Sequence, residues 1–204
     1  MLKVGLTGGI AAGKSVVGEM FMALGARLIQ ADQISHQLIQ PGQLVHQEVV
    51  RHFGQAILNP DQTVNRPKLA EAAFSGRIQE LNQIVHPAVL QKQKEWMADI
   101  GRKNPQAIAI VEAALILEAG SAKDFDRLVV VTCRPEQRIQ RWIQRMNVDQ
   151  EAARREVTRR MAAQLPDEEK IKAADYVIDN SGSLDETQKQ VHQIYAQLKQ
   201  KAEA

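Results

Sequence analysis

Residues 8–15 read Gly-Gly-Ile-Ala-Ala-Gly-Lys-Ser, the pattern G-x-x-x-x-G-K-S without a mismatch. The apolar run Val4-Gly5-Leu6 precedes this stretch, and a helical pattern from Lys14 to Leu24 follows it. A strand, a glycine-rich turn and a helix start in this order are typical of a phosphate-binding loop. A glycine-rich turn whose serine merely caps the helix is the alternative, but the matched context favours the loop. The chain is therefore predicted to bind a nucleoside triphosphate.

Each residue type in this stretch has a chemical reason to be there. Glycines let the backbone turn sharply and present successive N–H groups to phosphates, and the start of the helix adds a positive dipole end. Lys14 can reach the β- and γ-phosphates, and the Ser15 hydroxyl can ligate Mg²⁺. We expect ATP and Mg²⁺ to be held by Gly8, Gly9, Ala11, Ala12, Gly13, Lys14, Ser15 and Val16, with Ser15 as the metal ligand.

The composition is that of an ordinary globular chain. It has 204 residues, 44% of them hydrophobic and 25% charged, and a formal net charge of +2. This charge gives no general attraction to nucleic acid, and no stretch approaches the ~18 apolar residues of a membrane span. The single cysteine, Cys133, excludes a disulfide framework, and the start lacks the apolar core of a signal peptide. We expect a cytoplasmic monomer or weak homo-oligomer without nucleic-acid or membrane partners.

Five short apolar runs alternate with helical patterns along the chain. The runs cover residues 3–7, 26–30, 107–111, 127–133 and 176–179, and residues 184–204 have the spacing of an amphipathic helix. Such alternation predicts βαβ units, in which helices cover both faces of a parallel sheet. The expected fold is α/β, a three-layer fold of the P-loop NTPase type with a five-stranded parallel sheet.

A long stretch, about residues 32–104, separates the second run from the third without a strong strand signal. Helical patterns cover residues 44–53, 67–74 and 77–100. Because the stretch is too long for a simple crossover, we expect a helical insertion over the carboxyl edge of the sheet, where substrates bind in such folds. An arginine-rich stretch, about residues 138–170, is expected to form a lid. The core of this single domain would then be about residues 1–31, 105–135 and 174–204.

Asp32 follows the second predicted strand, at the edge of the sheet where the phosphate-binding loop also lies. A carboxylate there can orient or deprotonate an attacking hydroxyl, or help to hold Mg²⁺. It can equally be the N-cap of a helix that begins near Gln33. The spacing favours neither role, and the two are compatible.

Arg138, Arg141 and Arg145 fall at i, i+3 and i+7 of a predicted helix and so share one face. Guanidinium groups bind phosphate oxygens and neutralise charge on a transferring phosphoryl group. Such a run is usually a solvated face, but its place between the fourth and fifth strands favours at least one catalytic arginine. The other face is expected in the core, with Ile139, Trp142, Ile143 and Met146. Four more arginines follow, Arg154, Arg155, Arg159 and Arg160, of which the first two are expected to be solvated.

His86-Pro87 interrupts the helical pattern of residues 77–100. Proline breaks or kinks a helix, and the histidine beside it either faces the substrate cleft or is a buried, hydrogen-bonded structural residue. The five histidines show no metal-ligand spacing, and one cysteine cannot build a zinc site.

Residues 179–182, Asp-Asn-Ser-Gly, match the D-x-x-G pattern of a GTPase switch. The match lies far from the phosphate-binding loop, and no N-K-x-D guanine motif occurs. A turn after the last strand is the better interpretation, and Asn180 in it can touch the adenine.

Several motifs follow one another in a fixed order. They are Gly5-Leu6-Thr7-Gly8-Gly9-Ile10, Ala31-Asp32 with the helix to Pro41-Gly42, His86-Pro87, Leu115-Ile116-Leu117-Glu118, residues 141–145 (Arg-Trp-Ile-Gln-Arg), residues 161–164 (Met-Ala-Ala-Gln) and residues 174–182 (Ala-Asp-Tyr-Val-Ile-Asp-Asn-Ser-Gly). In this order they resemble the dephospho-CoA kinase family over essentially the whole chain. The phosphate-binding loop alone is shared by many enzymes, so the ordered set carries the resemblance.

The resemblance implies that ATP phosphorylates the ribose 3′-hydroxyl of dephospho-CoA, the last step of coenzyme A synthesis. The insertion would bind CoA, and the lid would be mobile. Asp32 would act at the hydroxyl, Lys14 and Ser15 with Mg²⁺ at the transferring phosphate, and Arg141 as charge stabiliser. It further implies nucleotide contacts from Arg145 and Asn180, and substrate contacts from Thr7, Asp32, His86 and Leu115. The chain departs from the usual family pattern at Ala11, Val16, Gln30, Glu112 and Ala114.

Two other functions fit part of this pattern. A kinase for a nucleoside monophosphate or a sugar acid would share the fold and the lid, because the insertion sets the acceptor. A nucleotide-gated binding module would share the phosphate-binding loop. The missing guanine motif and the arginine-rich lid weigh against the module.

Overall fold

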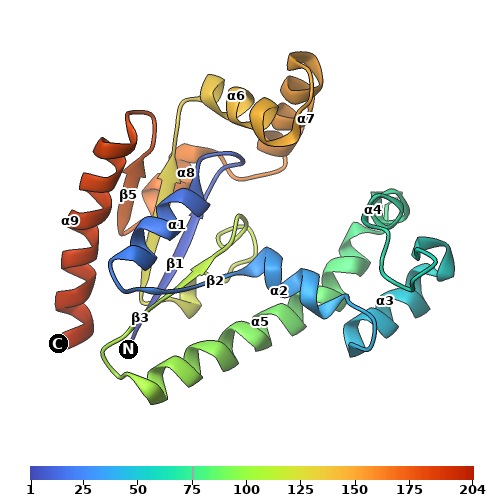
Figure 1. Ribbon diagram of the computed structural model, residues 1–204, viewed down its shortest axis with the longest axis horizontal. Helices are drawn as coiled ribbons and strands as arrows, with labels where there is room; N and C mark the ends of the chain where they lie inside the picture. Colours follow the sequence, from blue (N-terminus) through green and yellow to red (C-terminus); the bar gives the residue numbers. More distant parts are fainter. Residues whose placement is uncertain (75) are drawn as a thin grey trace. The chain divides into compact units, whose positions relative to one another are not determined.

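The computed structural model describes residues 1–74 and 76–204 (Figure 1). Five strands form one parallel sheet in the order β2-β3-β1-β4-β5. The strands are β1 (Leu2–Gly8), β2 (Arg27–Gln30), β3 (Ile108–Glu112), β4 (Arg127–Thr132) and β5 (Tyr176–Asp179). Each differs from its predicted run by no more than one residue at either end, so the α/β fold with a five-stranded parallel sheet is confirmed.

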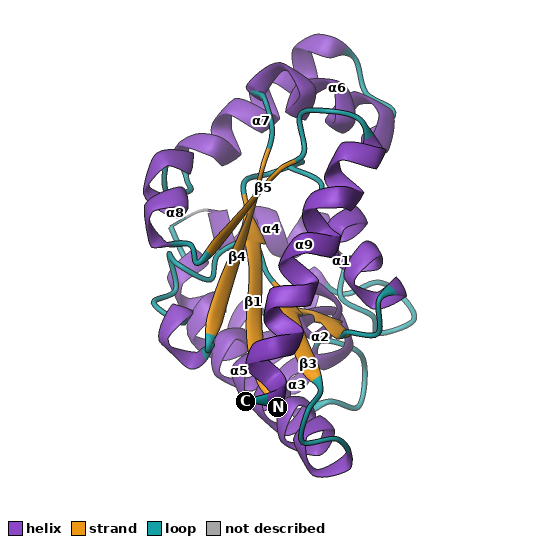
Figure 2. Cartoon of the chain, turned by 90° about the vertical axis from the view of Figure 1, so that its left-hand side faces the viewer, coloured by secondary structure: helices purple, strands orange, loops and turns teal. Residues whose placement is uncertain are grey.

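Helices cover both faces of the sheet because its central strands are apolar on both sides (Figure 2). On one face, α1 (Lys14–Ala23) and α9 (Leu184–Glu203) pack on the strands through Val17, Phe21, Val191, Ile194 and Leu198. On the other face, Leu128 and Val130 pack with Ile116 from the segment after β3, which includes the short helix η2 (Ala122–Asp124). This sandwich holds the start of α1, and with it the phosphate-binding loop, at the carboxyl end of β1.

The chain divides into two compact units, one of residues 1–28 with 99–204 and one of residues 29–98. The second unit contains α2 (Ala31–Leu38), α3 (Leu44–Phe53), η1 (Gln55–Ile57), α4 (Arg66–Phe74) and most of α5 (Ile78–Lys103). Its own core includes Ile34, Leu38, Val49, Phe53, Leu69 and Val89. The helices predicted within the insertion are therefore present, and α3 agrees with the prediction residue for residue.

Pro87 does not interrupt α5, contrary to the expectation from the sequence. The helix runs continuously from Ile78 to Lys103 with the proline inside it. Proline removes one N–H donor, and a helix of 26 residues keeps many other backbone hydrogen bonds on either side. Among the helices of the described residues, none is long and apolar enough to cross a membrane.

Between β4 and β5 the chain forms α6 (Pro135–Met146), α7 (Gln150–Ala162) and α8 (Asp167–Ala173). The first two pack together around Trp142, Ala153 and Val157, and Ile10 of the phosphate-binding loop joins this cluster. Met146 was expected in the core but is 49% exposed. The helix ends just beyond it, at Asn147 in a left-handed conformation, so no further turn covers its side chain.

Candidate functional site

The phosphate-binding loop has the backbone that its glycines predict. Gly13 has φ +97°, and a Cβ there would overlap the amide nitrogen of Asn180. A Cβ at Gly8 would overlap the Val131 carbonyl oxygen. Ala11 adopts φ +53°, a left-handed conformation that strains any residue with a Cβ. The loop therefore depends on glycine at two positions and carries strain at a third.

Side chains satisfy the carbonyl groups of this loop. Lys14 Nζ donates to the carbonyls of Gly8 (3.0 Å) and Gly9 (3.1 Å). Arg141 donates to the Ala12 carbonyl at 2.9 Å and to the Asn180 carbonyl at 2.7 Å. The Asn180 side chain also donates to the Ala12 carbonyl at 2.9 Å. Because these donors neutralise the negative ends of the peptide dipoles, the loop is suited to an anion.

Ser15 and Glu112 form the oxygen-rich part of the site. The Ser15 hydroxyl donates to Glu112 Oε1 at 2.9 Å, and the Glu112 carboxylate is buried at the carboxyl end of β3. A hydroxyl and a carboxylate are the hard oxygen ligands that Mg²⁺ prefers, and P-loop enzymes hold the metal with such a pair. The described residues contain no group of three or more His, Cys, Asp or Glu suited to a metal. Phosphate oxygens and water would complete the coordination.

Glu112 was not among the predicted site residues. Its signal was present, because a carboxylate directly follows the apolar run 107–111 and so lies at the carboxyl edge of a strand beside β1.

The three arginines of α6 differ in environment. Arg138 is 1% exposed and forms an ion pair with Asp167, so it does not belong to a solvated face. Arg141 is part-buried against the phosphate-binding loop. Arg145, a predicted nucleotide contact, is exposed in the last turn.

Three of the four arginines of α7 are paired with glutamates on their own helix. Arg155 is 2.8 Å from Glu151. Arg159 and Arg160 both hydrogen-bond Glu156 and lower the pKa of that carboxyl to about 2. All four are exposed, as expected for Arg154 and Arg155.

The predicted substrate contacts at the sheet edge differ from one another. Thr7 is fully buried, and its hydroxyl donates to the Ala114 carbonyl at 3.2 Å. Leu115 is exposed in the segment after β3. The Thr7 hydroxyl thus ties β1 to that segment, while Leu115 presents an apolar side chain to solvent.

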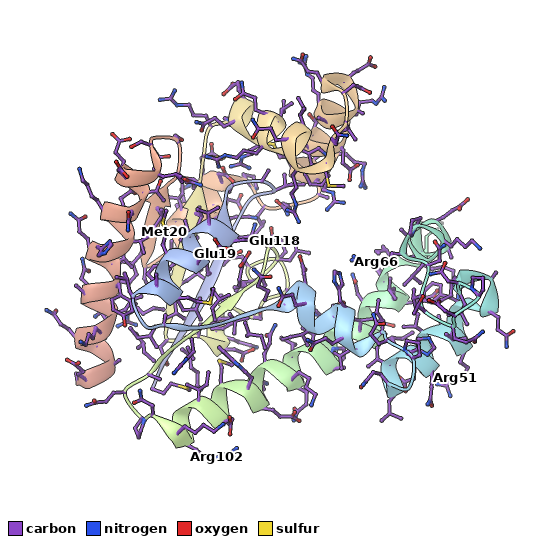
Figure 3. All side chains as sticks on the ribbon, in the orientation of Figure 1. Glu19, Met20, Arg51, Arg66, Arg102 and Glu118 are labelled. Atoms are coloured by element: carbon purple, nitrogen blue, oxygen red, sulfur yellow. The ribbon has the colours of Figure 1, made fainter. Side chains whose placement is uncertain are left out.

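Asp32 lies in the second unit, in the first turn of α2. It is not the N-cap, because α2 begins at Ala31 and Gln30 takes the cap position. His36 follows one turn later on the same face. Burial, and after it the nearby Arg66 guanidinium, lowers the pKa of His36, while Asp32 acts to raise it. Arg66 and Asp32 therefore act on His36 in opposite directions, and Figure 3 shows Arg66 at the start of α4.

His86 is exposed on α5, so the interpretation as a buried structural histidine is wrong.

On the other side of α2 from Asp32, the second unit contains a cavity of about 440 Å³. Ile34 and Leu38 of α2 line it together with Trp96 of α5. Ile34 and Leu38 are offset from Asp32 by about half a helical turn, so the Asp32 face and this cavity are separate surfaces.

A family model and curated relatives that match this chain carry the same family name. The sequence model described as dephospho-CoA kinase matches residues 2–186. A curated relative of that name from Aquifex aeolicus is 38% identical over 200 residues, 97% of this chain and 98% of the relative. Another of that name from Syntrophotalea carbinolica is 39% identical over 201 residues, 97% of this chain and 92% of the relative.

Solved structures agree in fold. The crystal structure of TT1252 from Thermus thermophilus superposes with a TM-score of 0.79 at 28% identity, over 97% of both chains. A shikimate kinase from Bacteroides thetaiotaomicron, at 12% identity and a TM-score of 0.53 over 97% of this chain and 98% of its own, shares the fold alone. The family match covers most of the chain, and the curated relatives are matched over nearly their full length. The chain belongs to the dephospho-CoA kinase family.

Proposed function

We propose that this protein transfers the γ-phosphoryl group of ATP to the ribose 3′-hydroxyl of dephospho-CoA, which completes coenzyme A, and that it does so in the cytoplasm. Membership of the family supports the reaction. The main support for ATP binding is the phosphate-binding loop. Its backbone carbonyls accept hydrogen bonds from Lys14, Arg141 and Asn180, and the Ser15–Glu112 pair lies beside it.

On the donor side, the chain supplies positive charge to the phosphates. The Lys14 ammonium would leave the Gly8 and Gly9 carbonyls for the β- and γ-phosphate oxygens. Arg141, fixed by the carbonyls of Ala11, Ala12 and Asn180, would stabilise charge that develops as the phosphoryl group leaves. A Mg²⁺ ion held by Ser15, with Glu112 beside it, would neutralise further phosphate charge. The Arg145 and Asn180 nucleotide contacts belong to this side of the proposal.

On the acceptor side, Asp32 would accept the proton of the 3′-hydroxyl as its oxygen attacks the γ-phosphorus and ADP leaves. Dephospho-CoA carries a diphosphate on the same ribose, a few bonds from that hydroxyl. Arg66 would offer this diphosphate a cationic partner, and His36, one helical turn from Asp32, an imidazole N–H donor. Thr7, His86 and Leu115 are the further substrate contacts that we propose.

Release of ADP with and without dephospho-CoA tests the proposal directly. We expect fast release from ATP that depends on dephospho-CoA, and only slow release from ATP alone. A nucleoside monophosphate and a sugar acid serve as alternative acceptors, and GTP as an alternative donor. Equal rates with another acceptor would reject the assignment of dephospho-CoA, and acceptor-independent hydrolysis would favour a nucleotide-gated module.

A further inference from the structure

The side chain of Gln164 reaches the phosphate-binding loop from the end of α7. Its Oε1 accepts a hydrogen bond from the Ile10 backbone N–H at 3.2 Å in a part-buried position. The Ile10 side chain is itself packed with Trp142, Ala153 and Val157 between α6 and α7. The loop is therefore tied to these helices at one residue, through its backbone and its side chain together.

A buried ion pair fixes the segment that carries Gln164. Three residues further on, Asp167 pairs with Arg138, whose guanidinium also donates to the Cys133 carbonyl at 3.3 Å. The same guanidinium lies against the loop backbone, because a Cβ placed on Gly9 would overlap its Nη1. Arg138 thus contacts the phosphate-binding loop on one side and the Gln164 segment on the other.

A second buried ion pair holds the same segment from the other side. The Lys170 side chain is fully buried, and its Nζ lies 2.9 Å from Glu118 Oε1, without the angles of a hydrogen bond. Glu118 Oε1 also accepts a hydrogen bond from the Leu165 N–H at 3.0 Å. Glu118 belongs to the segment after β3 and is labelled in Figure 3. The residue after Gln164 is therefore fixed to the segment that follows β3.

The two ion pairs, Arg138–Asp167 and Lys170–Glu118, are better explained by the way they position the chain than by a gain in the free energy of unfolding. Burying charges has a desolvation cost that often cancels the attraction of the pair, and apolar side chains of similar size would pack as well. What the charges add is one defined location for the segment from Gln164 to Lys170. The group that this location delivers to the nucleotide site is the Gln164 amide oxygen.

We propose that Gln164 is a positioning residue for nucleotide binding. It holds the Gly9–Ile10 peptide in the orientation in which the loop receives the phosphates. Glycine before this peptide permits other orientations, and loss of the acceptor would leave a part-buried N–H without its partner. The inference rests on the nucleotide half of the proposed function and is independent of the acceptor.

The test compares Gln164→Met with Gln144→Met. Methionine keeps the length of the side chain and removes the acceptor oxygen, and Gln144 is an exposed glutamine on α6 that makes the matched control. Binding of a non-hydrolysable ATP analogue with Mg²⁺ is measured by titration calorimetry, and KM for ATP and kcat by ADP release. For Gln164→Met we expect Kd for the analogue and KM for ATP to rise about 3- to 10-fold. We expect kcat and KM for dephospho-CoA to stay close to wild type.

A purely structural role would lower kcat through loss of folded protein and leave Kd unchanged. Wild-type Kd in Gln164→Met, or an equal rise in Gln144→Met, would overturn the inference. The titration uses no acceptor, so its result does not depend on which substrate the protein phosphorylates. Failure to phosphorylate dephospho-CoA would reject the proposed reaction, while the Kd difference would still decide the role of Gln164.

Discussion

The phosphate-binding loop and the Asp32 face of the second unit hold their polar groups in opposite ways. Lys14 and Arg141 each donate to two carbonyls of the loop, and Ser15 bonds a buried carboxylate. On the Asp32 face, the carboxylate and the Arg66 guanidinium are exposed and act on His36 electrostatically. The loop is organised before any ligand arrives, whereas the Asp32 face presents charges to solvent.

This difference predicts how the two sides respond to change. Groups fixed in advance around a developing charge lower the barrier to reaction without reorganising. Exposed side chains must be ordered and desolvated when the substrate binds, which reduces the affinity that they contribute. We therefore expect substitutions in the loop to act on kcat. Basic residues beside Asp32 should instead act on KM for dephospho-CoA, with Asp32 itself as the exception.

Asp32→Asn should give the largest effect. Asparagine nearly conserves the shape but cannot accept the hydroxyl proton, so transfer to dephospho-CoA should fall about 10²- to 10⁴-fold. Stability should fall by less than about 1 kcal/mol, because only a charge in the first turn of a helix is lost. Single-turnover transfer and a thermal melt measure the two effects. Glu48→Gln, on the exposed surface of α3, is the control. A folded Asp32→Asn protein with full activity would remove Asp32 from the mechanism.

Lys14→Ala should reduce phosphoryl transfer about 10²- to 10³-fold, because it removes a charge aimed at the transferring phosphate. Its fold should persist, since Lys14 is half-exposed and contributes little packing. Steady-state ADP release with dephospho-CoA measures the loss, and Lys94→Ala, exposed on α5, controls for removal of a lysine. Near-normal activity would contradict the role of the loop.

Arg141→Ala should lower kcat about 10²-fold and change KM for dephospho-CoA much less. The guanidinium is fixed beside the loop, where charge develops only as the phosphoryl group leaves. Arg154→Ala, exposed on α7, should have little effect. If KM for dephospho-CoA rose while kcat held, Arg141 would be a clamp for the acceptor instead.

Arg66→Ala should have the smallest effect of the four and the most selective one. We expect KM for dephospho-CoA to rise about tenfold, because one charge-assisted hydrogen bond to the substrate is lost. KM for ATP should stay unchanged. Arg51, exposed on α3 in the same unit and labelled in Figure 3, provides the matched control Arg51→Ala. An equal rise in both variants would reduce the effect to general charge attraction.

Hydrophobic periodicity was sufficient to predict the sheet and α3, because burial of apolar faces decides these elements. The loop was predictable for a different reason: its glycines and its lysine are required by backbone geometry and phosphate chemistry, and both are local in sequence. Asp32 could be singled out by its place after a strand. The cap position was missed because α2 begins at Ala31, and the end of an element is poorly defined by pattern.

The partnerships between distant residues could not be predicted in this way. The pattern placed Arg138 on one face with Arg141 and Arg145 but did not predict its burial, which depends on Asp167, 29 residues away. Glu112 became part of the site only through Ser15, 97 residues earlier. A side-chain pattern reports which face of a helix is polar, but the partner that neutralises a buried charge is set by tertiary structure.

The one cysteine of the chain offers an internal probe of the nucleotide site. Cys133 is buried at the end of β4, with its Sγ 3.8 Å from the Ala11 carbonyl. Because the thiol is buried, a thiol reagent can reach it only after the structure around it opens locally, so the alkylation rate of the native protein measures that opening. Nucleotide that binds the closed loop should slow the alkylation in proportion to its occupancy. The alkylation rate of Cys133 thus reports how often this part of the protein opens, and the experiment needs no introduced cysteine.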